Sequence, residues 1–223
     1  MNNPNDNCRL DPLFPGEIFY QGPPDIRSVA LTFDDAPDNL FAPVLLDILA
    51  QYDVKATFFF LGTCVHQNPN IVLRMFREGH IIANHSYSHT DITTLTPEQI
   101  QTEVRETQDE LQLITGLKTA LFRPPFGALN AESAQVVISM GYKIILWNVD
   151  SLDWMGLTGP AITARVVSAT VPGSIILMHN ACDGTIQAGT GTTQSLPYII
   201  EALRAEGYTF TTIPALLNIP AYQ

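Results

Sequence analysis

The chain has 223 residues, of which 46% are hydrophobic and 15% charged, and its 22 acidic and 11 basic residues give a net charge of −11. This apolar content is enough for a packed core and excludes an extensively disordered chain. The basic residues are scattered singly, which disfavours nucleic-acid binding, and the sequence lacks the apolar run of about 18 residues that a membrane-spanning helix needs.

Residues 1–24 are rich in Pro, Asn and Asp and are predicted to form an irregular N-terminal arm without the basic and apolar stretches of a signal peptide. Short apolar runs then predict strands near 26–33, 55–61, 80–85, 120–123, 142–148, 174–178 and 208–213. Amphipathic segments between them predict helices near 39–52, 67–78, 96–115, 130–140, 159–170 and 192–206.

The alternation of strands and helices predicts the fold. The run at 55–61 is almost wholly apolar, which is typical of a parallel strand buried on both faces. About seven such strands, joined through helices by short links, predict an α/β protein with a distorted (β/α) barrel. Because no linker interrupts the pattern, residues 25–223 are expected to form a single domain.

Polar residues gather at the predicted carboxyl ends of the strands, where barrel enzymes place their chemistry. In chain order, these residues are Asp34, Asp35, His85, His89, Arg123, Asp153 and His179. Each alone has an ordinary structural explanation, such as a turn, a helix cap or a hydrogen-bonded core residue. Their joint occurrence on one expected rim predicts an active site. The remaining histidines, His66 and His80, are expected to be structural or solvated.

The paired histidines and aspartates predict a metal centre. His85 and His89 offer two imidazole nitrogens, and one Asp completes a ligand set that zinc accepts while leaving a position open for water. The metal would acidify that water, and the second Asp could take its proton as general base. Since adjacent strand residues point in opposite directions, Asp34 and Asp35 are expected where the strand breaks into a loop before Pro37.

Hydrolysis of an amide also requires a proton for the departing amine. His179, on another strand end, is the candidate general acid, and Asp153 is the candidate carboxylate that keeps it protonated. Arg123 could hold the base by a charge-assisted hydrogen bond. Trp154 would offer an apolar wall to an acetyl methyl or a sugar face.

The three cysteines, Cys8, Cys64 and Cys182, have no zinc-binding spacing. Because their number is odd, we expect free thiols or at most one disulfide within the chain.

From about residue 26 to 213, the chain resembles the polysaccharide deacetylase family, carbohydrate esterase family four. The family's TFDDGP motif corresponds to TFDDAP at 32–37, and its His-x-x-x-His motif corresponds to 85–89. The resemblance implies that Asp34 is the catalytic base and that Asp35, His85 and His89 hold a divalent metal. Zinc is the expected ion, with cobalt as an alternative.

The later motifs of the family match as well. RPPFG at 123–127 corresponds to the third motif, which implies that Arg123 orients the base. Pro125 and Phe126 are then expected to line the substrate, with the backbone N–H of Phe126 stabilising the oxyanion. This motif usually has Tyr where the chain has Phe126, so a hydroxyl is missing while the backbone N–H remains. Ala36 replaces the family's Gly, which would cost about 1 kcal/mol if that position needs a positive φ.

The fourth and fifth motifs correspond to 150–154 and 177–179. They imply that Asp153 tunes His179, that Trp154 lines the pocket and that Leu177 lies near the acetyl methyl. The predicted activity is removal of N-acetyl groups from N-acetylglucosamine-containing glycans, either chitin oligomers or peptidoglycan. A metal-bound water would attack, with Asp34 as base and His179 as acid.

Two alternatives stay open. The same chemistry would serve an O-acetyl esterase acting on xylan-type glycans, and a barrel that has lost catalysis would be a glycan-binding protein. The substrate class leads us to expect a location in the cell wall or outside the cell.

Overall fold

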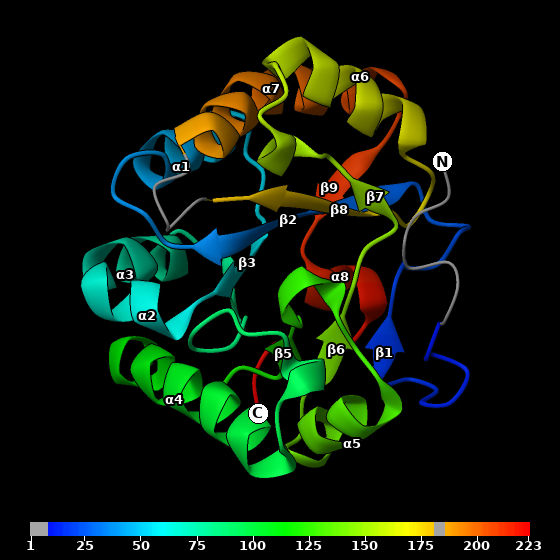
Figure 1. The fold of residues 1–223 in the computed structure, drawn as a ribbon. Helices are drawn as coiled ribbons and strands as arrows, with labels where there is room; N and C mark the ends of the chain where they lie inside the picture. Colours follow the sequence, from blue (N-terminus) through cyan, green and yellow to red (C-terminus); the bar gives the residue numbers. More distant parts are fainter. Residues whose placement is uncertain (1–8, 181–185) are drawn as a thin grey trace.

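The structure is a computed structural model that describes residues 9–180 and 186–223. Its strands are β1 (Ile18–Phe19), β2 (Ser28–Ala36), β3 (Thr57–Phe60), β4 (Ile81–Asn84), β5 (Leu121–Phe122), β6 (Lys143–Ile145), β7 (Val149–Asp150), β8 (Ile175–His179) and β9 (Thr209–Thr211). They form one sheet in the order β1-β6-β5-β4-β3-β2-β8-β7, with β9 beside β2 and every strand pairing parallel. The sheet curls with helices around it (Figure 1), which confirms the predicted distorted (β/α) barrel.

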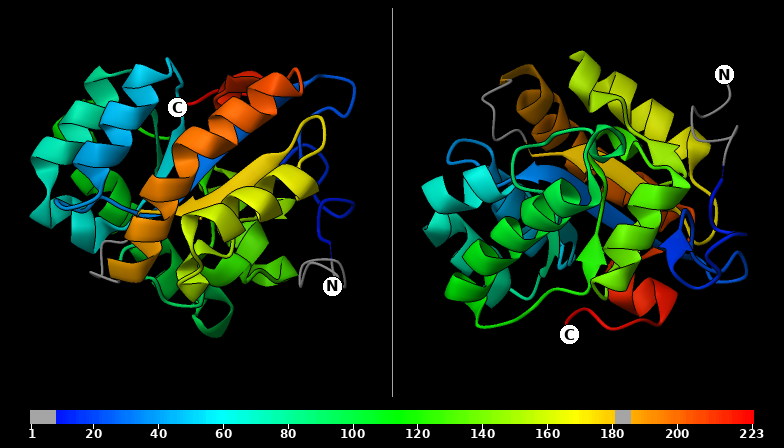
Figure 2. Two further views of the ribbon diagram at one scale, coloured as in Figure 1. Left: turned by 90° about the horizontal axis from the view of Figure 1, so that it is seen from above. Right: turned by 60° about the horizontal axis from the view of Figure 1, so that its bottom comes forward.

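The helices are α1 (Ala42–Gln51), α2 (Gly62–Gln67), α3 (Pro69–Arg77), α4 (Pro97–Thr115), α5 (Ala131–Ser139), α6 (Gly159–Ala169), α7 (Ile186–Ala205) and α8 (Ile213–Leu217), with 3₁₀ turns η2 (Ile92–Thr94), η3 (Pro125–Gly127) and η4 (Asp153–Met155). Helix α4 shows how sequence sets these bounds. A capping box between Thr96 and Gln99 satisfies its first N–H groups, and left-handed Gly116 ends it. Figure 2 shows α6 and α7 lying against each other over β8.

The structure adds elements that the sequence did not predict. The barrel has nine strands among its described residues rather than about seven, because β1 and β7 have only two residues each and are too short for a periodic signal. Helix α7 begins at Ile186 and not near 192. The glycines in this part of the helix allow close packing, since a Cβ on Gly189 would come within 2.2 Å of the Phe41 ring.

Part of the predicted N-terminal arm is ordered against the barrel. Strand β1 pairs with β6, with Ile18 opposite Ile144, and the side chains of Leu10 and Tyr20 are buried. Because Pro, Asn and Asp are abundant in residues 1–24, the composition did not indicate that a few apolar residues of the arm pack against the barrel. The domain boundary at residue 25 stays a prediction.

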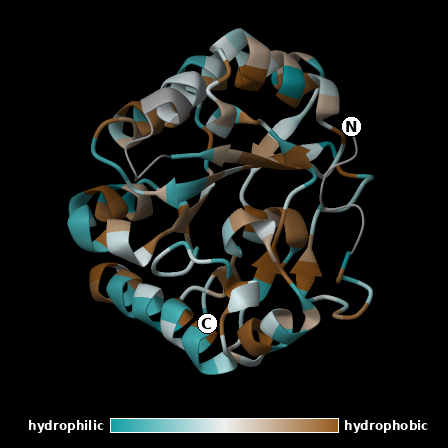
Figure 3. Cartoon of the chain, in the orientation of Figure 1, coloured by the Kyte–Doolittle hydropathy of each residue, from teal (hydrophilic) through white to brown (hydrophobic). Residues whose placement is uncertain are grey.

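Side-chain alternation along the strands divides the core into two clusters. On β2, Val29, Leu31 and Phe33 pack in a cluster with α1, α3, α6 and α7, whereas Ala30 belongs to the cluster that contains α4, α5 and α8. In Figure 3, several inner strands are coloured hydrophobic, whereas the surrounding helices carry both hydrophobic and hydrophilic residues. Because alternate residues share a face, Thr32 and Asp34 follow Ala30 onto the second face. The strand therefore directs Asp34 away from the helices that cover the first cluster.

Candidate active site

The two aspartates of β2 reach the same place through an irregularity in the strand. The pairing of β2 with β3 shifts register between Phe33 and Ala36, and Asp35 has a left-handed φ of 59°. Asp34 Oδ2 and Asp35 Oδ1 consequently lie 3.7 and 3.6 Å from Nε2 of His85. We expected a loop at this point, but the strand continues to Ala36, and the bulge overcomes the alternation that would separate the carboxylates.

Ala36 itself avoids the strain considered from the sequence. The residue with positive φ is Asp35, and Ala36 is not among the left-handed residues. Aspartate tolerates the left-handed region better than most residues with a side chain. The replacement of the family's Gly by Ala36 therefore leaves this turn without the expected penalty.

Asp35, His85 and His89 form a compact group of candidate metal ligands. One ligand atom from each residue lies within 4.8 Å of the others. Nε2 of His89 is 3.4 Å from Oδ1 of Asp35, and the two imidazole rings have centroids 5.2 Å apart. Burial, followed by the neighbouring His85, lowers the pKa of His89, which favours the neutral imidazole that binds metals.

The hydrogen bonds of this group fit a cation. Nδ1 of His85 lies 2.7 Å from the backbone oxygen of Arg123, and since a carbonyl can only accept, Nδ1 donates, which in the neutral ring leaves the lone pair on Nε2. That lone pair lies near Oδ1 of Asp35, a buried oxygen without a hydrogen-bond partner among the described residues. Buried oxygens are rarely left unpaired, so a divalent ion between these atoms would satisfy both.

Arg123 fixes the other carboxylate from a fully buried position. Its Nη1 donates to Oδ1 of Asp34 at 2.7 Å and to Oγ1 of Thr32 at 2.9 Å, while Nε donates to the backbone oxygen of Ile145 at 2.9 Å. The guanidinium also lies 4.1 Å from the centroid of the Phe59 ring. Because Arg123 occupies Oδ1, it leaves Oδ2 of Asp34 available on the side of His85.

His179 and Asp153 form a second charged pair, from β8 and η4. Nδ1 of His179 lies 2.7 Å from Oδ1 of Asp153, which also accepts from the backbone N–H of Trp154 at 2.9 Å. Oδ2 accepts from the backbone N–H of His179 at 2.8 Å and from Oγ1 of Thr192 at 2.5 Å. Burial opposes the charge on His179, but Asp153 prevails and raises the pKa of His179 to about 9. The imidazole is therefore protonated at neutral pH.

The predicted substrate-binding residues differ in exposure. Phe126 is 67% exposed, and its ring lies 4.4 Å from that of His89, while Trp154 is 56% exposed. Pro125 and Leu177 are buried, and Leu177 packs in the core cluster with α5 and α8. The structure thus places Phe126 beside the candidate metal ligands, and the roles of all four residues in binding remain predictions.

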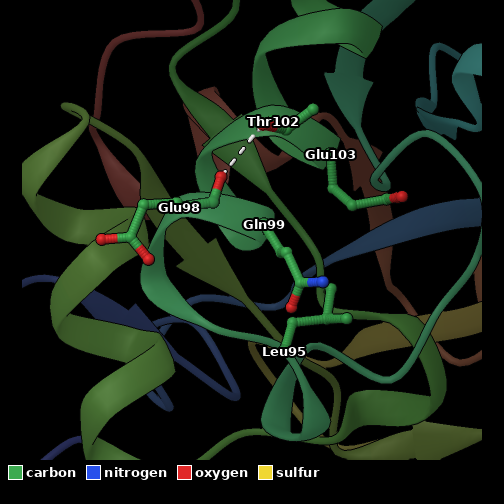
Figure 4. Close-up of a pocket in the computed structure, with 5 residues that line it drawn as sticks. All are labelled: Leu95, Glu98, Gln99, Thr102 and Glu103. Carbon is green, nitrogen blue, oxygen red and sulfur yellow. Dashed lines mark hydrogen bonds between the residues drawn. The ribbon is translucent and has the colours of Figure 1, made fainter.

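Two hollows lie near these groups. One, of about 420 Å³, is lined by Asp35, Leu61, Thr63, Cys64, Gln67, Ser88 and His89. The other, of about 280 Å³, lies along α4 and is lined by Leu95, Glu98, Gln99, Thr102 and Glu103 (Figure 4). The first of these two hollows is lined by two candidate metal ligands, Asp35 and His89, and the second by none.

His66, His80 and Cys64 are not part of the ligand cluster. His66 is exposed and near Glu110, while His80 is buried and accepts a hydrogen bond from the backbone N–H of Ala56. Cys64 is disulfide-bonded. Cys8 and Cys182 lie outside the described residues.

One contributor to the site was missed from the sequence. The carboxylate of Glu103 accepts backbone hydrogen bonds from Tyr87 and Ser88, between the two candidate histidine ligands. The signal was present, because Glu103 falls on the helix face that also carries buried Ile100 and Thr107. A charged residue on the buried face of an amphipathic helix indicates a specific partner.

Comparison with known proteins places the chain in a family. The polysaccharide deacetylase family matches residues 21–145, more than half of the chain, and the chain belongs to this family. The family and the enzyme class predicted from the motifs, a polysaccharide deacetylase, are confirmed.

Two curated relatives illustrate the range of similar proteins. A peptidoglycan-N-acetylglucosamine deacetylase of Bacillus cereus is 37% identical over 199 residues, which cover 89% of this chain and 71% of the relative. A chitooligosaccharide deacetylase of Rhizobium leguminosarum bv. trifolii is 33% identical over 204 residues, which cover 88% of this chain and 94% of the relative.

Solved structures share the fold. The Bc1960 peptidoglycan N-acetylglucosamine deacetylase matches with a TM-score of 0.89 and 35% identity, over 93% of this chain and 95% of that one. BA3943, a pseudoenzyme of carbohydrate esterase family four from Bacillus anthracis, matches with a TM-score of 0.83 and 31% identity, over 89% of this chain and 68% of that one. Within the described part of this chain, the helices are all too short or too polar to cross a membrane.

Proposed function

We propose that this protein removes N-acetyl groups from an N-acetylglucosamine-containing glycan of the cell wall, with peptidoglycan as the first substrate to test. The observation that carries the proposal is the buried Oδ1 of Asp35, which has no hydrogen-bond partner in the described part of the chain and lies 3.6 and 3.4 Å from the Nε2 atoms of His85 and His89. These residues would hold a divalent cation, for which zinc is the first choice and cobalt the alternative. When bound, such an ion polarises a carbonyl group and acidifies water.

Asp34 is the proposed general base. Arg123 holds its Oδ1, so the free Oδ2 faces the ligand cluster and can take a proton from an attacking water. The four buried contacts of the guanidinium, to Asp34, Thr32 and the backbone oxygens of Ile145 and Leu146, hold this carboxylate in one orientation. Fixed orientation of a proton acceptor lowers the barrier because no rearrangement is needed during reaction.

His179 is the proposed general acid. Its pKa of about 9 keeps the imidazole protonated at neutral pH, and its contact with Asp153 through Nδ1 leaves Nε2–H as the group that can donate. A departing amine needs this proton more than a departing alkoxide does. The pair therefore suits amide hydrolysis.

The rim would orient the glycan. Phe126 would supply its backbone N–H to the developing oxyanion, with Pro125 fixing the turn, and Leu177 would lie near the acetyl methyl. The exposed indole of Trp154 offers a face on which a sugar ring can stack. The names of the Bacillus cereus relative and of Bc1960 support peptidoglycan, and with it a location at the cell wall.

The proposal is tested by acetate release from peptidoglycan, chitin oligomers and acetylated xylan, with zinc or cobalt added. We expect release from peptidoglycan or chitin oligomers, its loss in Asp34→Asn, and normal release in the control Asp25→Asn, which makes the same change at an exposed position. Metal content is measured on the same samples. A wild-type protein that holds metal and releases no acetate from either N-acetylated glycan would contradict the proposal and favour a glycan-binding protein.

The same acetate-release assay distinguishes an O-acetyl esterase from an N-deacetylase. An O-acetyl esterase would release acetate from acetylated xylan alone. A His179→Ala variant that keeps ester cleavage and loses amide cleavage would show that the imidazolium serves the amine leaving group.

A further inference from the structure

The segment between the two candidate histidine ligands has an unusual backbone. Within the five residues from His85 to His89, Ser86 and His89 have left-handed φ angles of 69° and 60°. Residues with a side chain rarely adopt this conformation, because the Cβ atom then crowds the backbone. This shape, which brings both imidazoles to Asp35, therefore requires support from neighbouring elements.

One support is the carboxylate of Glu103 on α4. Its Oε2 accepts hydrogen bonds from the backbone N–H groups of Tyr87 at 2.9 Å and Ser88 at 2.8 Å, and its Oε1 accepts from Oγ of Ser88 at 2.7 Å. Three hydrogen bonds to one carboxyl group fix both the position and the direction of the loop.

The opposite side of the loop is held by backbone groups. The N–H groups of Gly62 and Thr63, at the start of α2, donate to the carbonyl oxygens of Ser86 and Tyr87 at 3.1 and 3.2 Å. The loop is thus held from both sides, by donors of α2 and by the acceptor Glu103. Of these two supports, only the one from Glu103 depends on a side chain, while at the start of the loop Oδ1 of Asn84 also accepts from the backbone N–H of Ser86 at 2.9 Å.

Glu103 contacts the loop between His85 and His89 rather than the candidate metal-binding side chains themselves. Figure 4 shows its carboxylate at one edge of the hollow along α4, pointing away from Glu98. It contacts the loop between the histidines and lies outside the residues that line the hollow with Asp35 and His89. It is partly buried, so water competes only partly for its hydrogen bonds.

We propose that Glu103 is a positioning residue of the metal centre, which holds the loop so that His85 and His89 direct Nε2 toward one point beside Asp35. The inference rests on the proposed function, because it assumes that these residues bind a cation. Outer residues that orient metal ligands typically contribute 10- to 100-fold to metal affinity. A residue that only joins α4 to the loop would contribute to stability and not to affinity.

The test measures the zinc dissociation constant of the full chain by competition with a chromophoric chelator. We expect affinity to fall about 10- to 100-fold in Glu103→Ala, and less in Glu103→Gln, whose amide oxygen can still accept from Tyr87 and Ser88. Glu106→Ala removes a charge from an exposed position of the same helix and should leave affinity unchanged. At saturating zinc, the turnover of Glu103→Ala should recover most of the wild-type value.

The results separate the two proposals. An affinity of Glu103→Ala within about twofold of wild type would overturn the inference, even if the melting temperature falls. If this variant does not fold, Glu103→Gln decides, and a weakening of about threefold or more supports the inference while an unchanged affinity overturns it. A wild-type protein that binds no zinc and no cobalt would instead end the proposed function.

Discussion

Replacing Asp153 with Asn should remove the charge that keeps His179 protonated. The pKa of His179 rises from 6.5 to about 9 in the folded protein, although burial alone would lower it. A rise of this size corresponds to about 3 kcal/mol in favour of the imidazolium. Without the carboxylate of Asp153 the pKa of His179 should fall, because burial lowers it and only the weaker influences of Asp35 and Asp34 still raise it. If the pKa returns to 6.5, about one quarter of the imidazole is protonated at pH 7.

The direct assay is an NMR titration of His179 in metal-free wild type and Asp153→Asn. In the metal-loaded enzyme, the alkaline limb of kcat/KM for amide hydrolysis should move to lower pH in the variant. Asp25→Asn, at an exposed position, is the control and should leave both curves unchanged. A His179 pKa that stays near 9 in Asp153→Asn would refute the assignment of Asp153 as its electrostatic partner.

The pair of His179 and Asp153 should also make the free energy of unfolding depend on pH. A histidine whose folded pKa is raised stabilises the folded state fully below its unfolded pKa of 6.5, and this contribution disappears as pH rises through about 9. The free energy of unfolding of wild type should therefore fall between pH 6.5 and 9, and that of Asp153→Asn should not show this fall. The amide N–H of the new Asn would also face a backbone N–H that now donates to the Asp153 carboxylate. Losing that hydrogen bond should lower the free energy of unfolding by about 1–3 kcal/mol at all pH values.

Three further perturbations test the remaining parts of the site. Removal of metal with a chelator should abolish acetate release, and zinc or cobalt should restore it; activity that survives complete removal, verified by elemental analysis, would argue against the ligand set. Arg123→Ala leaves Asp34 buried without its partner, so we expect about 3–5 kcal/mol of destabilisation by chemical denaturation, and a change below about 1 kcal/mol would contradict the importance of the pair. Gly62→Ala should destabilise by about 1–3 kcal/mol, because its Cβ would lie 2.2 Å from Cδ2 of Tyr87; an unchanged melting temperature would show that the ring moves freely.

Much of the barrel was predictable because its strands repeat one pattern. Strand β3 is wholly buried, and its run of Thr57 and three phenylalanines is what a strand covered on both sides requires. The bounds of α4 followed from Pro97 and Gly116, whose backbone preferences act locally. Local rules of this kind need no knowledge of the rest of the fold.

Features that depend on contacts between distant segments were not predictable. The bulge that aligns Asp34 with Asp35 arises from the pairing of β2 with β3, and the sequence around it indicated a loop. The contact of Glu103 with the histidine loop spans 15 or 16 residues and exists only once α4 packs beside β4. Short strands such as β7 form because their neighbours provide partners. In each case the cause is a tertiary contact, which the spacing of apolar residues along the sequence does not predict.

The position of β9 has a consequence for how the molecule forms during synthesis. This strand, near the end of the chain, pairs with the beginning of β2, and the hydroxyl groups of Ser28 and Thr209 meet across a sequence separation of 181 residues. Pairing between such distant residues forms slowly, because the chain loses conformational entropy before the contact stabilises the fold. Residues up to Thr211 must therefore have left the ribosome before β2, the strand that bears Asp34 and Asp35, gains β9 as a neighbour.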